Sequence, residues 1–204
     1  KNLSNKILFE NCLGIQANEK DCAVKRENII LIFGRYSENK NTMRSIKIMK
    51  ILKKIEEFNL LKFKVIVAGK DVQKLKLDSD FFQIIESPSD KILNEIFRKS
   101  SFFVSLSLYE GFGIAPLEAM SFGLVPILSD IENHSKHIYR SKVGQIIDLE
   151  LDDSKIANII YKFIKNFNKK NNQDKFLIRR SLYNYSLKFS TEKWNKKALK
   201  IFSA

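Results

Sequence analysis

The sequence predicts an α/β fold in which a doubly wound parallel sheet of about six strands is covered by helices on both faces. Two observations lead to this prediction. Short apolar runs without polar alternation recur along the chain, as expected for strands buried on both faces. Most of these runs are followed by a polar or glycine-containing loop and then by a helical pattern, the order typical of parallel crossovers. After Leu149 only helical patterns follow, so we expect further helices at the C-terminal end.

The individual elements follow from local pattern. The expected strands are Ile29–Phe33, 63–68, 81–85, 102–106, 125–128 and Gln145–Ile147. The expected helices are 42–57, one that starts at Ser89 and Asp90, 114–122, one capped by residues 152–154, 174–185 and a last one from Thr191. Ser89 is a suitable cap because its hydroxyl can accept a hydrogen bond from an unpaired N–H of the first turn.

These elements suggest a simple domain organisation. Residues 1–28 show no sustained period and are expected to be a lead-in segment or linker. Residues 29–190 are expected to form one Rossmann-like domain, and residues 191–204 a C-terminal helix. A chain of 204 residues with 44% hydrophobic residues can bury the core of one such domain.

Several other classes of protein are not favoured. No apolar run approaches the ~20 residues that span a bilayer, and no secretory signal is recognisable, so we expect a cytoplasmic protein. Cys12 and Cys22 lack the spacing of a zinc site or a disulfide scaffold. His134 and His137 are expected to face solvent, because no carboxylate or cysteine near them completes a metal site.

The formal net charge of +13 is concentrated towards the C-terminus, where residues 151–204 carry 13 Lys and Arg against 4 Asp and Glu. Such a surplus can attract nucleic acid or an anionic membrane surface, or serve solubility alone. Zinc-finger spacing, RNA-binding aromatic strings and a basic zipper are all absent, so nucleic acid is not an expected partner. Peripheral attachment at the inner face of a membrane stays open.

The most informative stretch is residues 107–129. An apolar strand ends in a turn at residues 110–113, a helix follows, and Gly123 ends that helix before the next strand. Ligands of parallel α/β sheets bind beyond the carboxyl ends of the strands. Glu110 lies in that position, and Glu118 lies in the helix that follows.

Residues 110–123 resemble the Glu-x7-Glu signature of GT-B fold glycosyltransferases, specifically the large group 4 of mostly retaining enzymes. The Gly-Phe-Gly after Glu110, the Ala119-Met120 after Glu118 and the closing Gly123 carry the match. The resemblance implies transfer of a hexose from a nucleoside-diphosphate sugar to a glycan or lipid-linked acceptor, as in polysaccharide biosynthesis, without a metal or cofactor.

The resemblance extends from about Ile29 to the C-terminus and covers only the second of the two domains of such enzymes. The chain also begins at Lys1 rather than with Met. We therefore expect an excised donor-binding domain, or one that works with a separate acceptor-domain subunit, and poor transfer by these residues alone.

The resemblance also assigns site residues. Gly34, Arg35 and Lys40 match the family string G-R-x-x-x-x-K-G, in which Arg and Lys contact the diphosphate, although Asn41 replaces the usual Gly. Glu110 is expected near the donor sugar, as a catalytic residue together with Arg35 and Lys40, and Glu118 at the ribose hydroxyls. Backbone groups are expected to contact the donor at Gly111, Phe112, Gly113, Ile114 and Ala115, and the nucleobase at Pro88. The Phe112 side chain fits a role in the core equally well.

Two other functions stay open. The domain could hold a nucleotide without catalysing transfer, or the basic helices after Leu151 could bind nucleic acid or a membrane surface. Diphosphate affinity without transfer would favour the first, and salt-sensitive binding to DNA or anionic vesicles the second.

Overall fold

The computed structural model of the chain describes residues 11–77 and 80–202. Residues 1–10 of the expected lead-in segment and residues 203–204 of the expected last helix lie outside the described residues. Within them, one sheet contains the strands β1 (Ile29–Phe33), β2 (Lys64–Gly69), β3 (Phe82–Glu86), β4 (Phe102–Ser105), β5 (Val125–Ser129) and β6 (Gln145–Ile147). The predicted fold class is therefore confirmed.

The sheet order is β3-β2-β1-β4-β5-β6, and every neighbouring pair is parallel. The direction of winding reverses between β1 and β4, which pair through Ile30 with Phe102 and Leu31 with Phe103. In an open parallel sheet such a reversal leaves a crevice beyond the carboxyl ends of the two strands. The loops after β1 and β4 therefore meet at one edge of the sheet.

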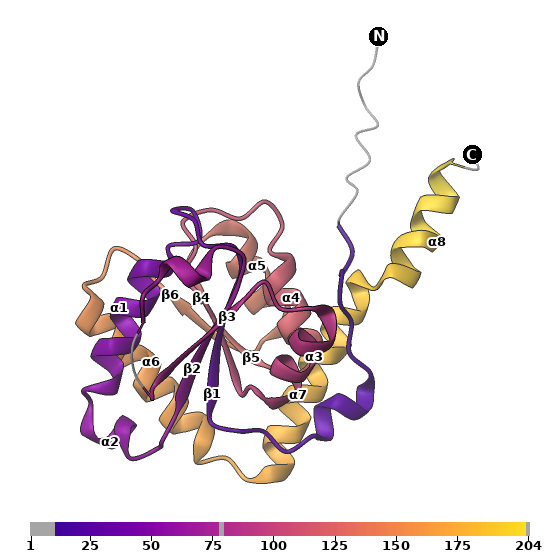
Figure 1. Cartoon of the computed structure of the whole chain (residues 1–204). Helices are drawn as coiled ribbons and strands as arrows, with labels where there is room; N and C mark the ends of the chain where they lie inside the picture. Colours follow the sequence, from indigo (N-terminus) through magenta and orange to yellow (C-terminus); the bar gives the residue numbers. More distant parts are fainter. Residues whose placement is uncertain (1–10, 78–79, 203–204) are drawn as a thin grey trace.

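The helices lie on both faces of the sheet (Figure 1). They are α1 (Thr42–Lys53), α2 (Glu56–Asn59), α3 (Asp90–Lys99), α4 (Ile114–Ser121), α5 (Glu132–Ser141), α6 (Asp153–Asn168), α7 (Asn172–Ser186) and α8 (Thr191–Phe202). Short 3-10 turns occur at η1 (Glu19–Ala23), η2 (Val72–Lys74) and η3 (Leu187–Phe189). Figure 1 shows α1 and α6 on one face, α3, α4 and α7 on the other, and α8 extending away from the body.

Side-chain caps define where several helices begin. Ser89 Oγ accepts a hydrogen bond from Ile92 N at 3.5 Å at the start of α3, as predicted. Asp152 caps α6 through Lys155 N at 2.9 Å. The side chain of Asn171 does the same for α7, which starts two residues earlier than the expected helix 174–185.

One expected helix is divided in two. The pattern predicted a continuous helix over 42–57, but α1 ends at Lys53 and α2 begins at Glu56. At the break the backbone hydrogen bonds span three residues instead of four, because Lys54 N donates to Ile51 O and Ile55 N to Leu52 O. Ile55 then takes an extended backbone, so its apolar side chain continues the period while the helix axis does not.

The core has two layers, one on each face of the sheet. Along β1, Ile30 and Ile32 belong to the layer under α1 and α6, whereas Ile29 and Leu31 belong to the layer under α3. Both faces of the strand are therefore buried, which is why its sequence is continuously apolar.

Residues 11–28 pack on the domain. Leu13 is buried, its N donates to Phe189 O at 3.0 Å, and its carbonyl accepts a bond from Thr191 Oγ1 at 3.3 Å. Ala17 N donates to Ser121 Oγ of α4 at 3.3 Å. This segment therefore lies between α4 and the turn that precedes α8, while the predicted domain boundaries stay a prediction.

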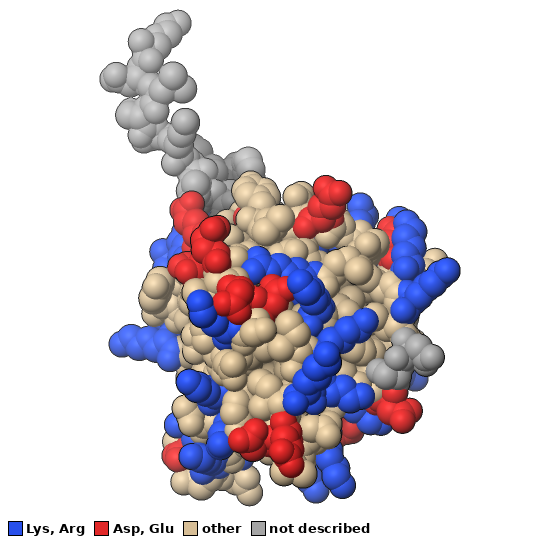
Figure 2. All heavy atoms as spheres, turned by 90° about the vertical axis from the view of Figure 1, so that its left-hand side faces the viewer, with Lys and Arg blue, Asp and Glu red and all other residues tan. Residues whose placement is uncertain are grey.

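Basic side chains on the face around α1 alternate with acidic ones, as Figure 2 shows. Asp153, for example, pairs with Arg44 Nε and Lys47 Nζ, each at 2.8 Å. Among residues 11–77 and 80–202, no helix has the length and apolar character needed to cross a membrane.

Candidate functional site

Two glycines bring the first loops of the carboxyl edge into contact. Gly34 follows β1 and Gly69 ends β2, with φ angles of 151° and 143°. A Cβ atom on Gly69 would lie 2.0 Å from the carbonyl oxygen of Gly34. Only glycine fits there, and the close approach fixes the start of the loop that carries Arg35 and Lys40.

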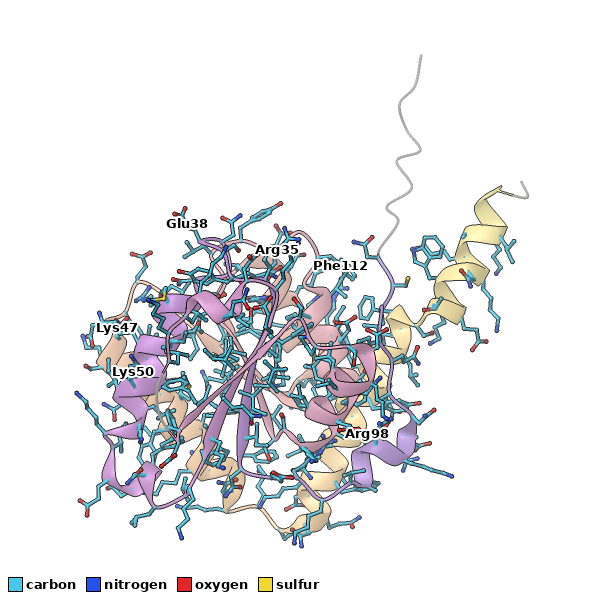
Figure 3. All side chains as sticks on the ribbon, in the orientation of Figure 1. Arg35, Glu38, Lys47, Lys50, Arg98 and Phe112 are labelled. Atoms are coloured by element: carbon cyan, nitrogen blue, oxygen red, sulfur yellow. The ribbon has the colours of Figure 1, made fainter. Side chains whose placement is uncertain are left out.

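The loops after β1 and β4 are joined by an ion pair. Lys40 Nζ lies 2.6 Å from Glu110 Oε1, and Ser107 Oγ donates to the same oxygen at 2.8 Å. Leu108 N also donates to Asn39 O at 2.8 Å. The sheet thus brings together two predicted site residues, and Arg35 lies exposed at the same edge (Figure 3).

The Gly-Phe-Gly turn is held from below by α5. Asn133 Nδ2 donates to the carbonyl oxygens of Glu110 at 2.9 Å and Gly111 at 2.8 Å. The Phe112 ring packs edge-on against His137 and Phe189, with ring centroids 5.8 and 5.7 Å apart. The side chain of Phe112 therefore packs in the fold, and the turn offers mainly its backbone to a ligand.

The two histidines of α5 are buried, so the prediction that they face solvent is wrong. His134 is 0% exposed and His137 is 3% exposed. His134 Nδ1 lies 3.0 Å from Ser129 Oγ, and His137 lies 3.0 Å from both Phe112 O and Tyr185 OH. The protein itself supplies these polar partners, which allows α5 to bury both rings beneath the turn.

Burial lowers the pKa of His134 to about 4, against the opposing charge of Glu110. The unfolded chain binds this proton near pH 6.5 and the folded chain does not, so stability should fall as the pH drops from about 6.5 to about 4. We expect His134 to contribute roughly 3 kcal/mol to that loss.

Urea unfolding of the wild type and His134→Gln at pH 7, 5.5 and 4.5 measures this effect. Only the wild type carries His134, so its advantage in free energy of unfolding over the variant should shrink towards low pH. Losses from carboxylates that both proteins share cancel in this difference. A constant difference across the window would contradict the assignment.

Glu118 is a buried carboxylate on α4, only 7% exposed. Its Oε1 accepts hydrogen bonds from Gly14 N at 3.1 Å and Ile15 N at 3.0 Å. A Cβ atom on Gly14 would lie 2.9 Å from that oxygen, so the absence of a side chain there permits the contact. Burial raises the pKa of Glu118, while the two N–H groups oppose the shift. Among the described residues, no group donates to Oε2.

Glu118 lies on the wall of a hollow of about 460 Å³ at the carboxyl edge of the sheet, which we call the Glu118 hollow. Its walls are formed by Gly14, Ile15, Phe33, Gly69, Lys70, Ser87, Pro88, Asp90, Leu93 and Glu118. The hollow spans the ends of β1, β2 and β3 and the start of α3. It has the size of a small-molecule site, and its charged lining residues are the buried Glu118, the exposed Asp90 and Lys70.

Comparison with known proteins gives the family. Residues 16–177 match the model of the family described as glycosyl transferases group 1. The chain belongs to this family. In the parts of the chain that the structure describes, no group of three or more His, Cys, Asp or Glu side chains could hold a metal ion.

Two bacterial relatives of this glycosyltransferase domain carry the name GDP-mannose:cellobiosyl-diphosphopolyprenol alpha-mannosyltransferase. The one from Xanthomonas oryzae pv. oryzae (strain PXO99A) is 32% identical over 151 residues, which cover 69% of this chain and 39% of the relative. The one from Komagataeibacter xylinus is 32% identical over 153 residues, covering 70% and 38%. The chain thus spans about two fifths of the length of these relatives.

The fold also matches solved glycosyltransferase structures. The structure of the pneumococcal O-GlcNAc transferase GtfA superposes with a TM-score of 0.71 at 16% identity, covering 93% of this chain and 38% of GtfA. These values confirm the GT-B half-domain fold.

The structure places the predicted site residues of this glycosyltransferase domain in two groups. Pro88 and Glu118 line the Glu118 hollow. The other predicted residues lie on the neighbouring loops after β1 and β4 and at the start of α4; they are Gly34, Arg35, Lys40, Glu110, Gly111, Phe112, Gly113, Ile114 and Ala115. The individual roles of these residues stay predictions.

Several lining residues were not predicted. Lys70 and Ser87 directly follow β2 and β3, so the rule that directed attention to Glu110 could have identified them. Gly14 and Ile15 had no such signal, because they lie in a segment without periodicity and reach Glu118 across more than a hundred residues.

Proposed function

We propose that this chain is the donor-binding half of a retaining glycosyltransferase, which transfers a hexose from a nucleoside-diphosphate sugar to a glycan or lipid-linked acceptor. The observation that carries the proposal is the Glu118 carboxylate, whose Oε1 is held by backbone N–H groups while Oε2 lacks a donor among the described residues. A carboxylate oxygen in that state accepts a hydroxyl hydrogen, as a ribose would supply.

The arrangement of the loops suggests how a donor would lie. The nucleoside would occupy the Glu118 hollow, with its base near the Pro88 loop and its ribose at Glu118. The diphosphate would extend towards Lys40, Arg35 and the N-terminus of α4 at Gly113. In that position these groups would stabilise the negative charge of the leaving diphosphate, which is the main catalytic contribution we assign to this half.

The Lys40–Glu110 ion pair gives that proposal a specific feature. Both side chains are largely covered, with 29% and 11% of their surfaces exposed. Glu110 holds the Lys40 ammonium at the sheet edge before the donor binds, which reduces the entropy lost on binding. Glu110 itself would lie beside the transferred sugar.

The names of the relatives suggest the first donor to test, GDP-mannose, and a polyprenol-linked acceptor. Because the matched residues cover only 39% of the Xanthomonas relative, we propose that acceptor contacts come from a further domain or subunit. The proposal includes no resident metal or cofactor, as the sequence resemblance implies.

Thermal unfolding in the presence of UDP, GDP, ADP and CDP tests the proposal. A ligand at 100 times its dissociation constant should stabilise the chain by about 2.7 kcal/mol. We expect GDP to give the largest shift, and the shift to persist in EDTA. Unfolding midpoints that stay at the value of the unliganded chain with all four nucleotides would contradict donor binding by this chain.

Two substitutions at Glu118 separate its two contacts. In Glu118→Gln the amide oxygen can still accept from Gly14 N and Ile15 N, so we expect near-normal stability. The amide NH2 then replaces the acceptor Oε2, and the GDP-induced shift should disappear. Glu118→Ala leaves both N–H groups without their acceptor and should also lower the free energy of unfolding by about 2 kcal/mol.

The measurements are urea unfolding without ligand and thermal shift with GDP, on the wild type and both variants. A Glu118→Gln protein that binds GDP as tightly as the wild type would show that Glu118 only holds the Gly14 segment.

A further inference from the structure

A second hollow, of about 450 Å³, lies at the opposite edge of the sheet, where the strands begin. Asn28 immediately precedes β1 and Ser101 immediately precedes β4, and both line it. Its remaining walls come from the segment 22–26, the end of α6 and the first turns of α7. We call it the basic pocket. It shares no lining residue with the Glu118 hollow.

Charge sets the basic pocket apart. Four of its lining residues are cations, Lys25, Arg26, Lys175 and Arg179, and none is Asp or Glu. This contrasts with the face around α1, where Asp153 pairs with basic neighbours. The pocket therefore concentrates positive charge without an internal counter-ion.

The two arginines lack complete hydrogen bonding. Arg26 directs its terminal nitrogens to backbone carbonyls, but its Nε is buried without a partner, as is Nε of Arg179. Burial lowers the pKa of both guanidinium groups, and the charge of Arg179 lowers that of Arg26 further. No carboxylate of the described residues forms an ion pair with Arg179. An anion in the pocket would offset this desolvation and repulsion.

The surroundings favour a phosphoryl group. Asn172 and Lys175 lie in the first turn of α7, a helix of 15 residues whose N-terminal N–H groups attract anions. Lys175 Nζ donates to Asn168 O at 2.9 Å and has further donors to offer. Phe167 and Phe176 add an apolar wall, which suits a ligand with a carbon skeleton behind its charged group.

We propose that the basic pocket binds a phosphoryl group, carried either by a free small molecule or by a phospholipid headgroup. The guanidinium of Arg179 and the ammonium of Lys175 are the principal donors, while Arg26 adds charge from a structural position. The site lies at the edge opposite the proposed donor site and does not depend on it.

Inorganic phosphate and vesicles are the probes. We would titrate the ¹⁵N-labelled chain with phosphate and follow the amide signals of Asn172 and Lys175 in NMR spectra. Arg179→Gln and Lys175→Gln should each weaken binding roughly ten-fold, the loss of one charge-assisted hydrogen bond. Arg180→Gln is the matched control, since Arg180 carries the same charge, pairs with Glu19 at the surface and does not line the pocket.

Sedimentation with phosphatidylglycerol and phosphatidylcholine vesicles distinguishes the two sources. Phosphate-induced changes in the amide signals that need more phosphate in both pocket variants, but not in Arg180→Gln, support a free phosphoryl ligand. Binding only to phosphatidylglycerol, weakened in the same two variants, supports a headgroup. Absence of both, or equal binding by Arg179→Gln, Lys175→Gln and the wild type, overturns the proposal. Because Glu118→Gln should leave these results unchanged, failure here is distinguishable from failure of the donor assignment.

Discussion

Replacement of Gly69 by alanine is expected to lower the free energy of unfolding by about 3 kcal/mol or more and to abolish the GDP-induced shift. The new Cβ would lie 2.0 Å from Gly34 O and 2.6 Å from Gly34 C, both backbone atoms that no rotamer change can move. The φ of 143° adds backbone strain for any residue with a side chain. The loops after β1 and β2 must then separate, which displaces the wall of the Glu118 hollow.

Gly111→Ala is the control for this experiment. A Cβ atom on Gly111 would meet nothing within 4 Å, so the substitution should change stability by no more than about 0.5 kcal/mol. Urea unfolding measures both variants. Similar stabilities for Gly69→Ala and Gly111→Ala would mean that the backbones at Gly34 and Gly69 do not approach as described.

Arg26→Met is the second substitution with a large expected effect, a loss of about 3–5 kcal/mol. Arg26 Nη1 donates to Phe97 O and Arg98 O at 2.6 Å each and to Ser100 O at 3.3 Å. Its Nη2 donates to Asp21 O at 2.8 Å and also to Phe122 O. One side chain therefore joins the segment before β1 to the ends of α3 and α4.

The desolvation of Arg26 opposes these bonds, since burial lowers its pKa to about 10, but the group stays charged at neutral pH. Methionine keeps most of the volume and leaves five carbonyl contacts without their donor. Arg140→Met, at an exposed position, should be nearly neutral and serves as the control. Equal thermal unfolding midpoints of Arg26→Met and Arg140→Met in calorimetry would show that Arg26 does not stabilise the fold.

Local sequence pattern was sufficient for much of the fold. A strand buried on both faces is mostly apolar, so β1 and the first three residues of β4 can be recognised without any knowledge of their neighbours. The same holds for the turn at Glu110 and for Ser89, whose capping bond spans three residues. The Glu-x7-Glu pattern is equally local, which is why the family could be recognised before the fold was known.

Predictions failed where a residue's surroundings come from distant segments. His134 and His137 have polar side chains, yet both are buried: Ser129 of β5 pairs with Nδ1 of His134, and the Phe112 carbonyl and Tyr185 of α7 pair with His137. The apolar period over 42–57 could not show that the axis breaks at Ile55, because a turn can keep the same apolar side inward.

What the sequence by itself determined is therefore the set of strands, the helices other than α5, the loops that follow the strands, and the family. Periodicity and capping act over a few residues, so they can be read along the chain. Only the tertiary structure decided that Glu118 holds Gly14 across 104 positions, and that Lys40 meets Glu110 across 70. It also gathered the four cations of the basic pocket from two distant segments. The physical reason is that the order of strands in the sheet sets these distances, and that order arises from packing between elements rather than from any local preference.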